Sequence, residues 1–132
     1  MAEPSGQAST RVAEVVSLTV PGSLEYVRVI RLTAAAVAAR LGFDVEEIED
    51  LRVAVDELAS VVIEAGRDNE ITLKFSNFGD TFIVEGTASV DREPALDALT
   101  RQILTVVVDD FELGVADGVA RFRASKQAAP TG

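Results

Sequence analysis

An acidic pair, Asp56 and Glu57, interrupts the apolar segment LRVAVDELASVVIEAG at residues 51–66. Apolar residues recur in this segment at spacings of three and four, which predicts a helix with one buried face. Two adjacent carboxylates at the centre of such a helix allow two interpretations. The simpler one is that both side chains face water. The alternative is that they are the remains of a site for phosphate chemistry.

The composition limits which chemistry the chain can carry out. It contains no cysteine and no histidine. Disulfides, thiolate metal sites and the common zinc sites are therefore excluded. Ser-His-Asp and Cys-His catalysis are excluded for the same reason. Any enzyme built from this chain must use carboxylates, lysine, arginine or a bound nucleotide.

The net charge of −10 indicates which partners the chain does not bind. Phosphate groups would be repelled, so direct binding to nucleic acid or to an anionic membrane is not expected. The charge favours a basic partner protein or serves solubility alone, and both interpretations stay open. The start MAEPSGQASTR has no apolar run behind a basic segment, and TAAAVAA is too short to span a bilayer. We therefore expect a cytoplasmic protein.

The first elements after the N-terminus are a strand and a helix. Alternating apolar residues predict a strand over 13–20. A helix over 24–41 follows, with Ser23 as its N-cap and Gly42 just past its end. The apolar stripe of this helix consists of Val27, Ile30, Ala34, Val37 and Leu41.

The second helix begins with a pattern that resembles a capping box, formed by Asp44 and Glu47, and ends at Gly66. Its central buried stripe consists of Ile48, Leu51, Val55, Leu58 and Val62.

The pattern of apolar and turn residues in the second half of the chain predicts two hairpins with a third helix between them. Strands are expected over 70–75 and 81–86, and a closing hairpin over 111–115 and 119–124. Pro94 is expected near the start of the helix between them. The apolar stripe of that helix is expected to consist of Leu96, Leu99, Ile103 and Val106 or Val107.

This order of elements predicts the fold class α/β (α+β). We expect a two-layer sandwich in which three helices cover one face of a mixed, mostly antiparallel sheet. The length of 132 residues suits one domain. Small polar residues at both ends predict flexible tails over 1–10 and 126–132, which leaves a single domain over 11–125.

The segment LTVPGSLEYVRVIRLTAAAVAARLGFDVEEIEDLRVAVDELASVVIEAG resembles the first half of the RsbW-type anti-sigma factors. These are small serine-protein kinases with the ATPase fold of the histidine kinases, gyrase and MutL. The resemblance rests on the strand ending in proline and on EYVRVIRL, LGF and IEDLRVAVDEL. It covers residues 13–66 well, and 70–86 and 109–124 more loosely.

The resemblance implies a role for two positions in the second helix. The family has a glutamate there, its proposed general base, and four residues later an asparagine that holds magnesium. Glu57 occupies the glutamate position and Val61 the asparagine position. Residues four apart lie on one helix face. Because magnesium requires oxygen ligands, valine cannot replace the asparagine. Glu57 is thus either a vestigial base or an ordinary residue of the polar face.

The second nucleotide motif of the family is also altered. It consists of an aspartate that reads adenine, followed by Gly-x-Gly. By resemblance, Glu85 stands at the aspartate position, and Thr87 and Ser89 at the glycines. TASVDRE then joins Gly86 to Pro94, without a glycine and too short for the lid of the family. The pattern predicts no cofactor, because it disfavours both ATP and magnesium.

The resemblance also places a partner surface on the first helix. This helix belongs to the surface where the family meets the sigma factor and its antagonist. The candidate residues are Glu25, Tyr26, Arg28 and Arg31. For the arginines, the alternative is a solvated face with a salt bridge to Glu25 or another acidic residue. For Tyr26 the alternative is the core.

The function implied by the resemblance is that of an anti-sigma factor. It would sequester an alternative sigma factor of RNA polymerase in a partner-switching system. A homodimer and release by an anti-anti-sigma protein of the STAS type are implied as well. Two alternatives stay open: an active serine-protein kinase that phosphorylates the STAS-type protein, and a pseudo-kinase adaptor for another regulator.

Overall fold

The computed structural model describes residues 14–66 and 69–129. In chain order, the elements are β1 (Val15–Pro21), the 3-10 turn η1 (Leu24–Tyr26), α2 (Val27–Arg40), α3 (Val45–Ala65), β2 (Glu70–Phe78), β3 (Thr81–Ser89), α4 (Ala98–Val107), β4 (Asp110–Ala116) and β5 (Val119–Gln127). All the strands and helices expected from the sequence are present. The tail expected over 1–10 lies outside the described residues, as do residues 130–132.

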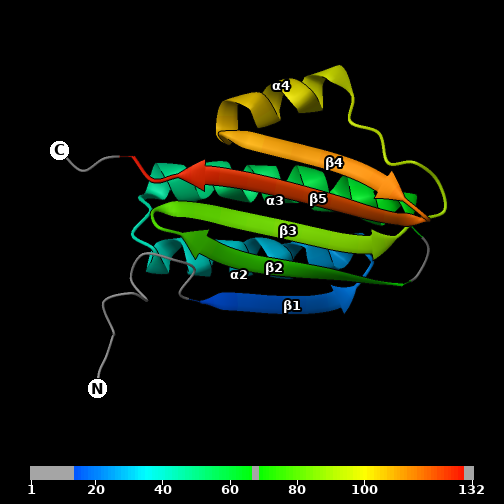
Figure 1. Cartoon of the computed structure of the whole chain (residues 1–132), viewed down its shortest axis with the longest axis horizontal. Helices are drawn as coiled ribbons and strands as arrows, with labels where there is room; N and C mark the ends of the chain where they lie inside the picture. Colours follow the sequence, from blue (N-terminus) through cyan, green and yellow to red (C-terminus); the bar gives the residue numbers. More distant parts are fainter. Residues whose placement is uncertain (1–13, 67–68, 130–132) are drawn as a thin grey trace.

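The five strands form one sheet in the order β1-β2-β3-β5-β4. All four neighbouring pairs are antiparallel, so the sheet is antiparallel throughout and not mixed. The helices α2 and α3 cover one face of the sheet, and α4 lies along the β4 edge (Figure 1). The predicted two-layer fold class is confirmed.

The alternation of side chains along the strands gives the sheet a buried and an open face. Phe82, Val84 and Ala88 of β3 are buried beneath the helices, while Glu85 between them is exposed. The core lies between the buried face and the helices. Its largest fully buried side chains are Phe75, Phe82, Ile30, Leu51, Leu58, Ile71, Leu73, Leu104, Val55, Val62 and Val84.

The helix boundaries follow local signals in the sequence. The capping box at the start of α3 is confirmed: Asp44 Oδ1 accepts from the backbone N–H of Glu47 at 2.8 Å, and Glu47 Oε1 accepts from that of Asp44 at 2.9 Å. Gly42 ends the preceding helix with a φ of +88°, which glycine adopts without strain. Ser23 differs from the expectation: its side chain makes no capping hydrogen bond, and the helix starts with the 3-10 turn.

The prediction for α4 was wrong in two respects. The helix begins at Ala98, with Asp97 as its N-cap, so Pro94 is buried in the connection before it. Leu99 and Val106, expected in the buried stripe, are 66% and 80% exposed. The helix buries Val107, the other residue expected at that position, and Leu104, which was not expected. It lies at the edge of the sheet, so only a narrow strip of its surface meets the core.

The domain extends slightly beyond its expected C-terminal end. β5 continues to Gln127, and Lys126 Nζ donates to the carbonyl oxygen of Val107 at 3.1 Å. Residues 126 and 127 therefore belong to the sheet and not to a tail. Within the described ranges, no helix is long and apolar enough to cross a membrane.

Candidate functional site

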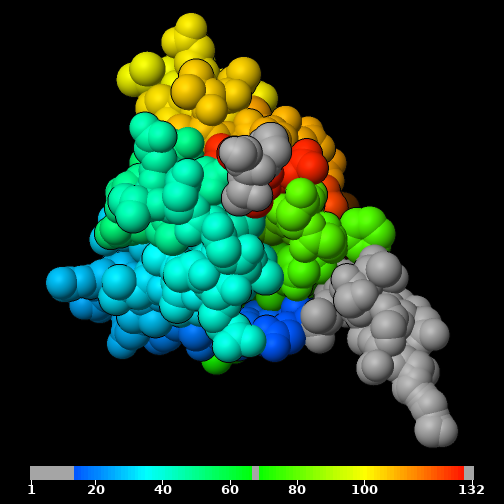
Figure 2. All heavy atoms as spheres, turned by 90° about the vertical axis from the view of Figure 1, so that its left-hand side faces the viewer, coloured from blue at the N-terminus to red at the C-terminus, as the bar shows by residue number. Residues whose placement is uncertain are grey.

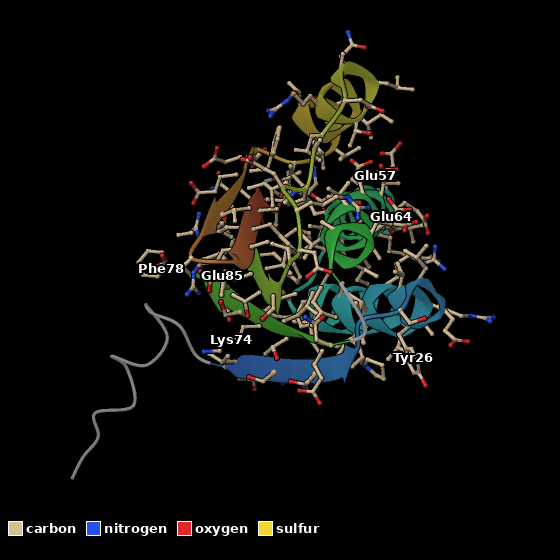
Figure 3. The ribbon with its side chains drawn as sticks, turned by 90° about the vertical axis from the view of Figure 1, so that its right-hand side faces the viewer. Tyr26, Glu57, Glu64, Lys74, Phe78 and Glu85 are labelled. Carbon is tan, nitrogen blue, oxygen red and sulfur yellow. The ribbon has the colours of Figure 1, made fainter. Side chains whose placement is uncertain are left out.

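The position of Glu57 is set by the way α3 lies on the sheet. The neighbouring residue Leu58 is fully buried, which leaves Glu57 half-buried at the margin of the buried face. Figure 3 shows Glu57 and Glu64 on the part of α3 nearer to α4. Across residues 14–66 and 69–129, no hydrogen bond or ion pair involves the carboxylate of Glu57. Its place and partial exposure are those of a surface carboxylate beside the core.

Val61 follows Glu57 by one turn on the same side of α3 and is half-buried. Its side chain offers no oxygen to a cation. In the described part of the chain, no group of three or more acidic, histidine or cysteine side chains is placed to hold a metal ion. Since Mg²⁺ takes oxygen ligands, Val61 cannot serve as the magnesium ligand that the resemblance places at this position.

A connecting segment, residues 90–97, runs from β3 to α4 and is tied to the end of α3. The backbone N–H of Asp91 donates to the carbonyl oxygen of Ala65 at 2.8 Å. The Arg92 guanidinium donates to the carbonyl oxygen of Glu64 at 2.6 Å. These bonds satisfy carbonyl groups that a helix end leaves without partners. Pro94 is buried and Leu96 packs against the core, so the segment is part of the packed domain.

Glu85 lies on the wrong side of the sheet for the role that its sequence position suggested. It is exposed on the open face of β3, opposite Lys74 of β2 and Arg123 of β5. Its carboxylate lies 3.9 Å from the guanidinium of Arg123. Figure 3 shows it across the sheet from Glu57. The structure therefore does not bring Glu85 and Glu57 into one site, because odd-numbered residues of β3 point away from the helices.

The helix-facing position beside Glu85 is Gly86, which is buried and has no side chain. The ring of Phe122 occupies the space that a Cβ at Gly86 would need. Ala88, two residues on, offers only a methyl group to the helix side. No carboxylate of β3 can thus reach a base bound between the sheet and α3. Val61, Gly86 and Ala88 therefore offer no side-chain oxygen to a cation or a base on this side of the sheet.

The four candidate partner residues have different environments. Glu25 in η1 and Arg28 near the start of α2 are exposed. Tyr26 is half-buried and packs against the core. Arg31 is turned towards α3, where its Nη1 lies 3.1 Å from Oδ2 of Asp56. Arg31 therefore joins two helices, while Glu25 and Arg28 are free to meet a partner.

Exposed apolar residues surround Arg28, and the sequence analysis missed them. Leu24, Val29 and Leu32 are 49%, 39% and 56% exposed. They do not belong to the apolar stripe that begins with Val27. Apolar residues outside that stripe were the sequence signal that could have identified them. We call Leu24, Glu25, Arg28, Val29 and Leu32 the α2 surface.

The family model of the histidine kinase-like ATPase domain matches residues 20–131. The serine-protein kinase RsbW of Bacillus subtilis (strain 168) is 36% identical over 72 residues, which covers 52% of this chain and 45% of that protein. RsbW of Halalkalibacterium halodurans is 38% identical over 63 residues, covering 48% and 39%. The chain thus spans less than half the length of these relatives.

A solved structure shows the same fold. The crystal structure of the RsbU and RsbW domains of Rv1364c from Mycobacterium tuberculosis has a TM-score of 0.73 and 15% sequence identity. The match covers 89% of this chain and 33% of the other. The family model spans most of the chain, so the chain belongs to the histidine kinase-like ATPase domain family, in which it is similar to the RsbW serine-protein kinases.

Proposed function

We propose that the chain is an anti-sigma factor that sequesters an alternative sigma factor of RNA polymerase in a partner-switching system. We also propose that it acts in the cytoplasm without ATP-dependent kinase activity. The similarity to RsbW proteins supports the first part. The second part rests on the residues around Glu57.

The observation that carries the second part is the packing of the connecting segment against the end of α3. A nucleotide-binding ATPase of this fold needs an open space beside this helix and oxygen ligands for a cation. Here the Arg92 guanidinium donates to the Glu64 carbonyl, Pro94 is buried, and Val61 presents methyl groups. Opening this region would break hydrogen bonds and expose apolar surface, without yielding a cation ligand at Val61.

The α2 surface is the proposed sigma-binding face. Affinity in such interfaces comes mainly from a few apolar or aromatic side chains that become fully buried, and charges set the choice of partner. Leu24, Val29 and Leu32 supply exposed apolar area, and Arg28 supplies an exposed cation. An otherwise acidic protein with a cation at this position favours a partner segment that carries a carboxylate next to apolar residues.

We infer that the sigma factor is released by a STAS-type anti-anti-sigma protein and that the chain acts as a homodimer. Phosphorylation of the antagonist by another kinase would reset the switch, and simple competition for the α2 surface would do so without any kinase. Neither mechanism requires a nucleotide on this chain.

The alternative function is that of an active serine-protein kinase that phosphorylates a STAS-type protein. Glu57 supports it, because a half-buried carboxylate is present at the position of the base. The name of the relatives, serine-protein kinase, supports it too. Nucleotide binding separates the two functions.

The proposed function is tested by recovering the full chain from its host and identifying the bound proteins. An alternative sigma factor is expected with the wild type and is expected to be lost with Leu32→Asp. Val45→Asp is the matched control, because Val45 is exposed at the start of α3, outside the α2 surface. Recovery of no sigma factor with the wild type, or equal recovery with Leu32→Asp, would contradict the proposal.

A further inference from the structure

The strand β4 has one edge without a partner. It pairs with β5 only, so the N–H and C=O groups along its outer edge meet no other strand of the described sheet. Natural proteins protect such edges with charged side chains, especially lysine, with proline or a bulge, or by covering them with a helix or loop. The sequence DFELGVA of β4 contains neither lysine nor proline, and its pairing with β5 runs from Asp110 to Ala116 without a bulge. β4 carries the charged residues Asp110 and Glu112 and lies beside α4, but no strand of the described sheet pairs with its outer edge, so its backbone groups there are open to another strand.

A groove lies beside this edge. It has a volume of about 580 Å³ and lies between Phe111–Val115 of β4 and Glu93–Leu96 of the connecting segment. Phe111 and Leu113 are half-buried against the core, and Val115 is 38% exposed. Figure 2 shows α4 and β4, in yellow and orange, at the end of the molecule away from α2.

The charged group contributed by α4 to the groove is Arg101. No hydrogen bond or ion pair of its guanidinium occurs within residues 14–66 and 69–129. The same groove contains Glu93 and Glu112, so its charges are mixed, and Arg101 is the cation of its lining. A carboxylate on a bound molecule would be attracted to Arg101.

We propose that this groove binds an extended segment of a partner protein, which adds a sixth strand along β4. The free backbone groups of β4 require an extended polypeptide, because only another strand can pair with a whole row of N–H and C=O groups. The segment would carry apolar residues at alternate positions, to pack against Leu96 and Phe111, and an acidic residue that meets Arg101. This goes beyond the proposed sigma-binding function, because the groove and the α2 surface lie on different parts of the molecule.

A second copy of the chain fits the groove less well than an extended segment. α4 packs on both α3 and β4, so it lies in the helix layer at this edge of the sheet (Figure 1). Direct pairing of two β4 edges would bring both copies of α4 to the same edge, where they compete for one space. A single extended segment has no such helix and avoids this collision.

The experiment selects peptides from a phage-displayed random library on the full chain and measures their affinity for three variants. Val115→Lys places a charge on the free edge. Its matched control is Val16→Lys, because Val16 lies on β1, the other edge strand, and is also 38% exposed. Arg101→Glu reverses the charge in the groove. Selected peptides should alternate apolar residues with at least one Asp or Glu.

We expect these peptides to bind the wild type and Val16→Lys equally, and to bind Val115→Lys and Arg101→Glu at least tenfold more weakly. The proposal is overturned if no peptide is enriched, or if the enriched peptides bind Val115→Lys as tightly as the wild type. If Val115→Lys fails to fold, hydrogen exchange of the wild-type protein with and without peptide is the test. A bound peptide should slow the exchange of backbone amides in β4. If the peptide protects amides only outside β4, the proposal is overturned.

Sedimentation velocity of the full chain without peptide identifies a second copy as the occupant. Self-association in the wild type that is lost in Val115→Lys would overturn the assignment to a separate partner segment. Failure of this proposal is distinct from failure of the proposed function, since recovery of a sigma factor is expected to be the same with Val115→Lys and the wild type.

Discussion

The guanidinium group of Arg92 lies 2.6 Å from the carbonyl oxygen of Glu64 and ties the connecting segment to the last turn of α3. The backbone N–H of Asp91 also donates to the carbonyl oxygen of Ala65, so two bonds hold the segment against the end of this helix.

Arg92→Ala is expected to lower the free energy of unfolding by about 1–2 kcal/mol. A hydrogen bond from a charged donor to a carbonyl is worth about this much at a partly exposed site. Urea denaturation measures the change. The matched control is Arg121→Ala, because Arg121 is exposed on the open face of the sheet. Equal stability of the two variants would contradict a structural role for Arg92.

Apolar periodicity predicted the buried face of α3 well and that of α4 poorly. The position of each helix on the sheet explains both results. α3 lies over the middle of the sheet, so a wide stripe is buried and the apolar period follows the core. α4 lies at the edge, so Leu99 satisfies the period but remains exposed. Apolar periodicity shows which residues share a face, but only tertiary packing decides which face is covered.

The need for tertiary packing also determines which residues of the candidate site could be placed from the sequence. Glu57 and Val61 could be placed from helix spacing alone, because both lie on one element. Glu85 could not, because a shift of one residue along a strand moves a side chain to the other face. A salt bridge of Arg31 to an acidic residue was one expected alternative, but its partner Asp56 could not be named, since the pairing depends on how two helices approach each other.

A double-mutant cycle of Arg31→Ala and Asp56→Ala should give a coupling energy of about 0.5–1 kcal/mol. The Arg31 and Asp56 side chains are 33% and 39% exposed, so water weakens their attraction, although it spans two helices. Denaturant unfolding of the four proteins measures it. A coupling near zero would show that the pair does not stabilise the packing of α2 on α3.

Leu104→Ala and Leu99→Ala should differ strongly, although both change leucine to alanine on α4. Leu104 is fully buried, so its truncation should cost about 2–5 kcal/mol. Leu99 is 66% exposed, so its truncation should cost less than about 0.5 kcal/mol. Thermal unfolding compares the two. Similar losses would mean that the burial of α4 is assigned to the wrong face.

Acid is expected to weaken the start of α4 through Asp97. A hydrogen bond from the backbone N–H of Thr100, with a further one from the Thr100 side chain, lowers the pKa of Asp97 from its ordinary value of 3.8. Because the pKa is lower in the folded state, the carboxylate stabilises the fold above the unfolded pKa. This contribution disappears as the pH falls through the folded pKa.

The NMR shift of the Thr100 amide, followed between pH 6 and pH 2 as roughly the range in which an aspartate titrates, reports this change. The shift should titrate with a midpoint below 3.8 in the wild type. Asp97→Asn is the control, since its amide oxygen can accept the same bond but does not titrate in this range. A midpoint at or above 3.8 would contradict the cap.

The most direct test of the account is a melting curve of the full chain with excess Mg-ATP and with magnesium alone. A ligand at 100 times its dissociation constant adds about 2.7 kcal/mol, or a rise in Tm of about 8 °C for a domain of this size. We predict the same Tm in both conditions. A rise in Tm that grows with the ATP concentration and is lost in Glu57→Ala would contradict the claim that this chain binds a protein partner without a nucleotide.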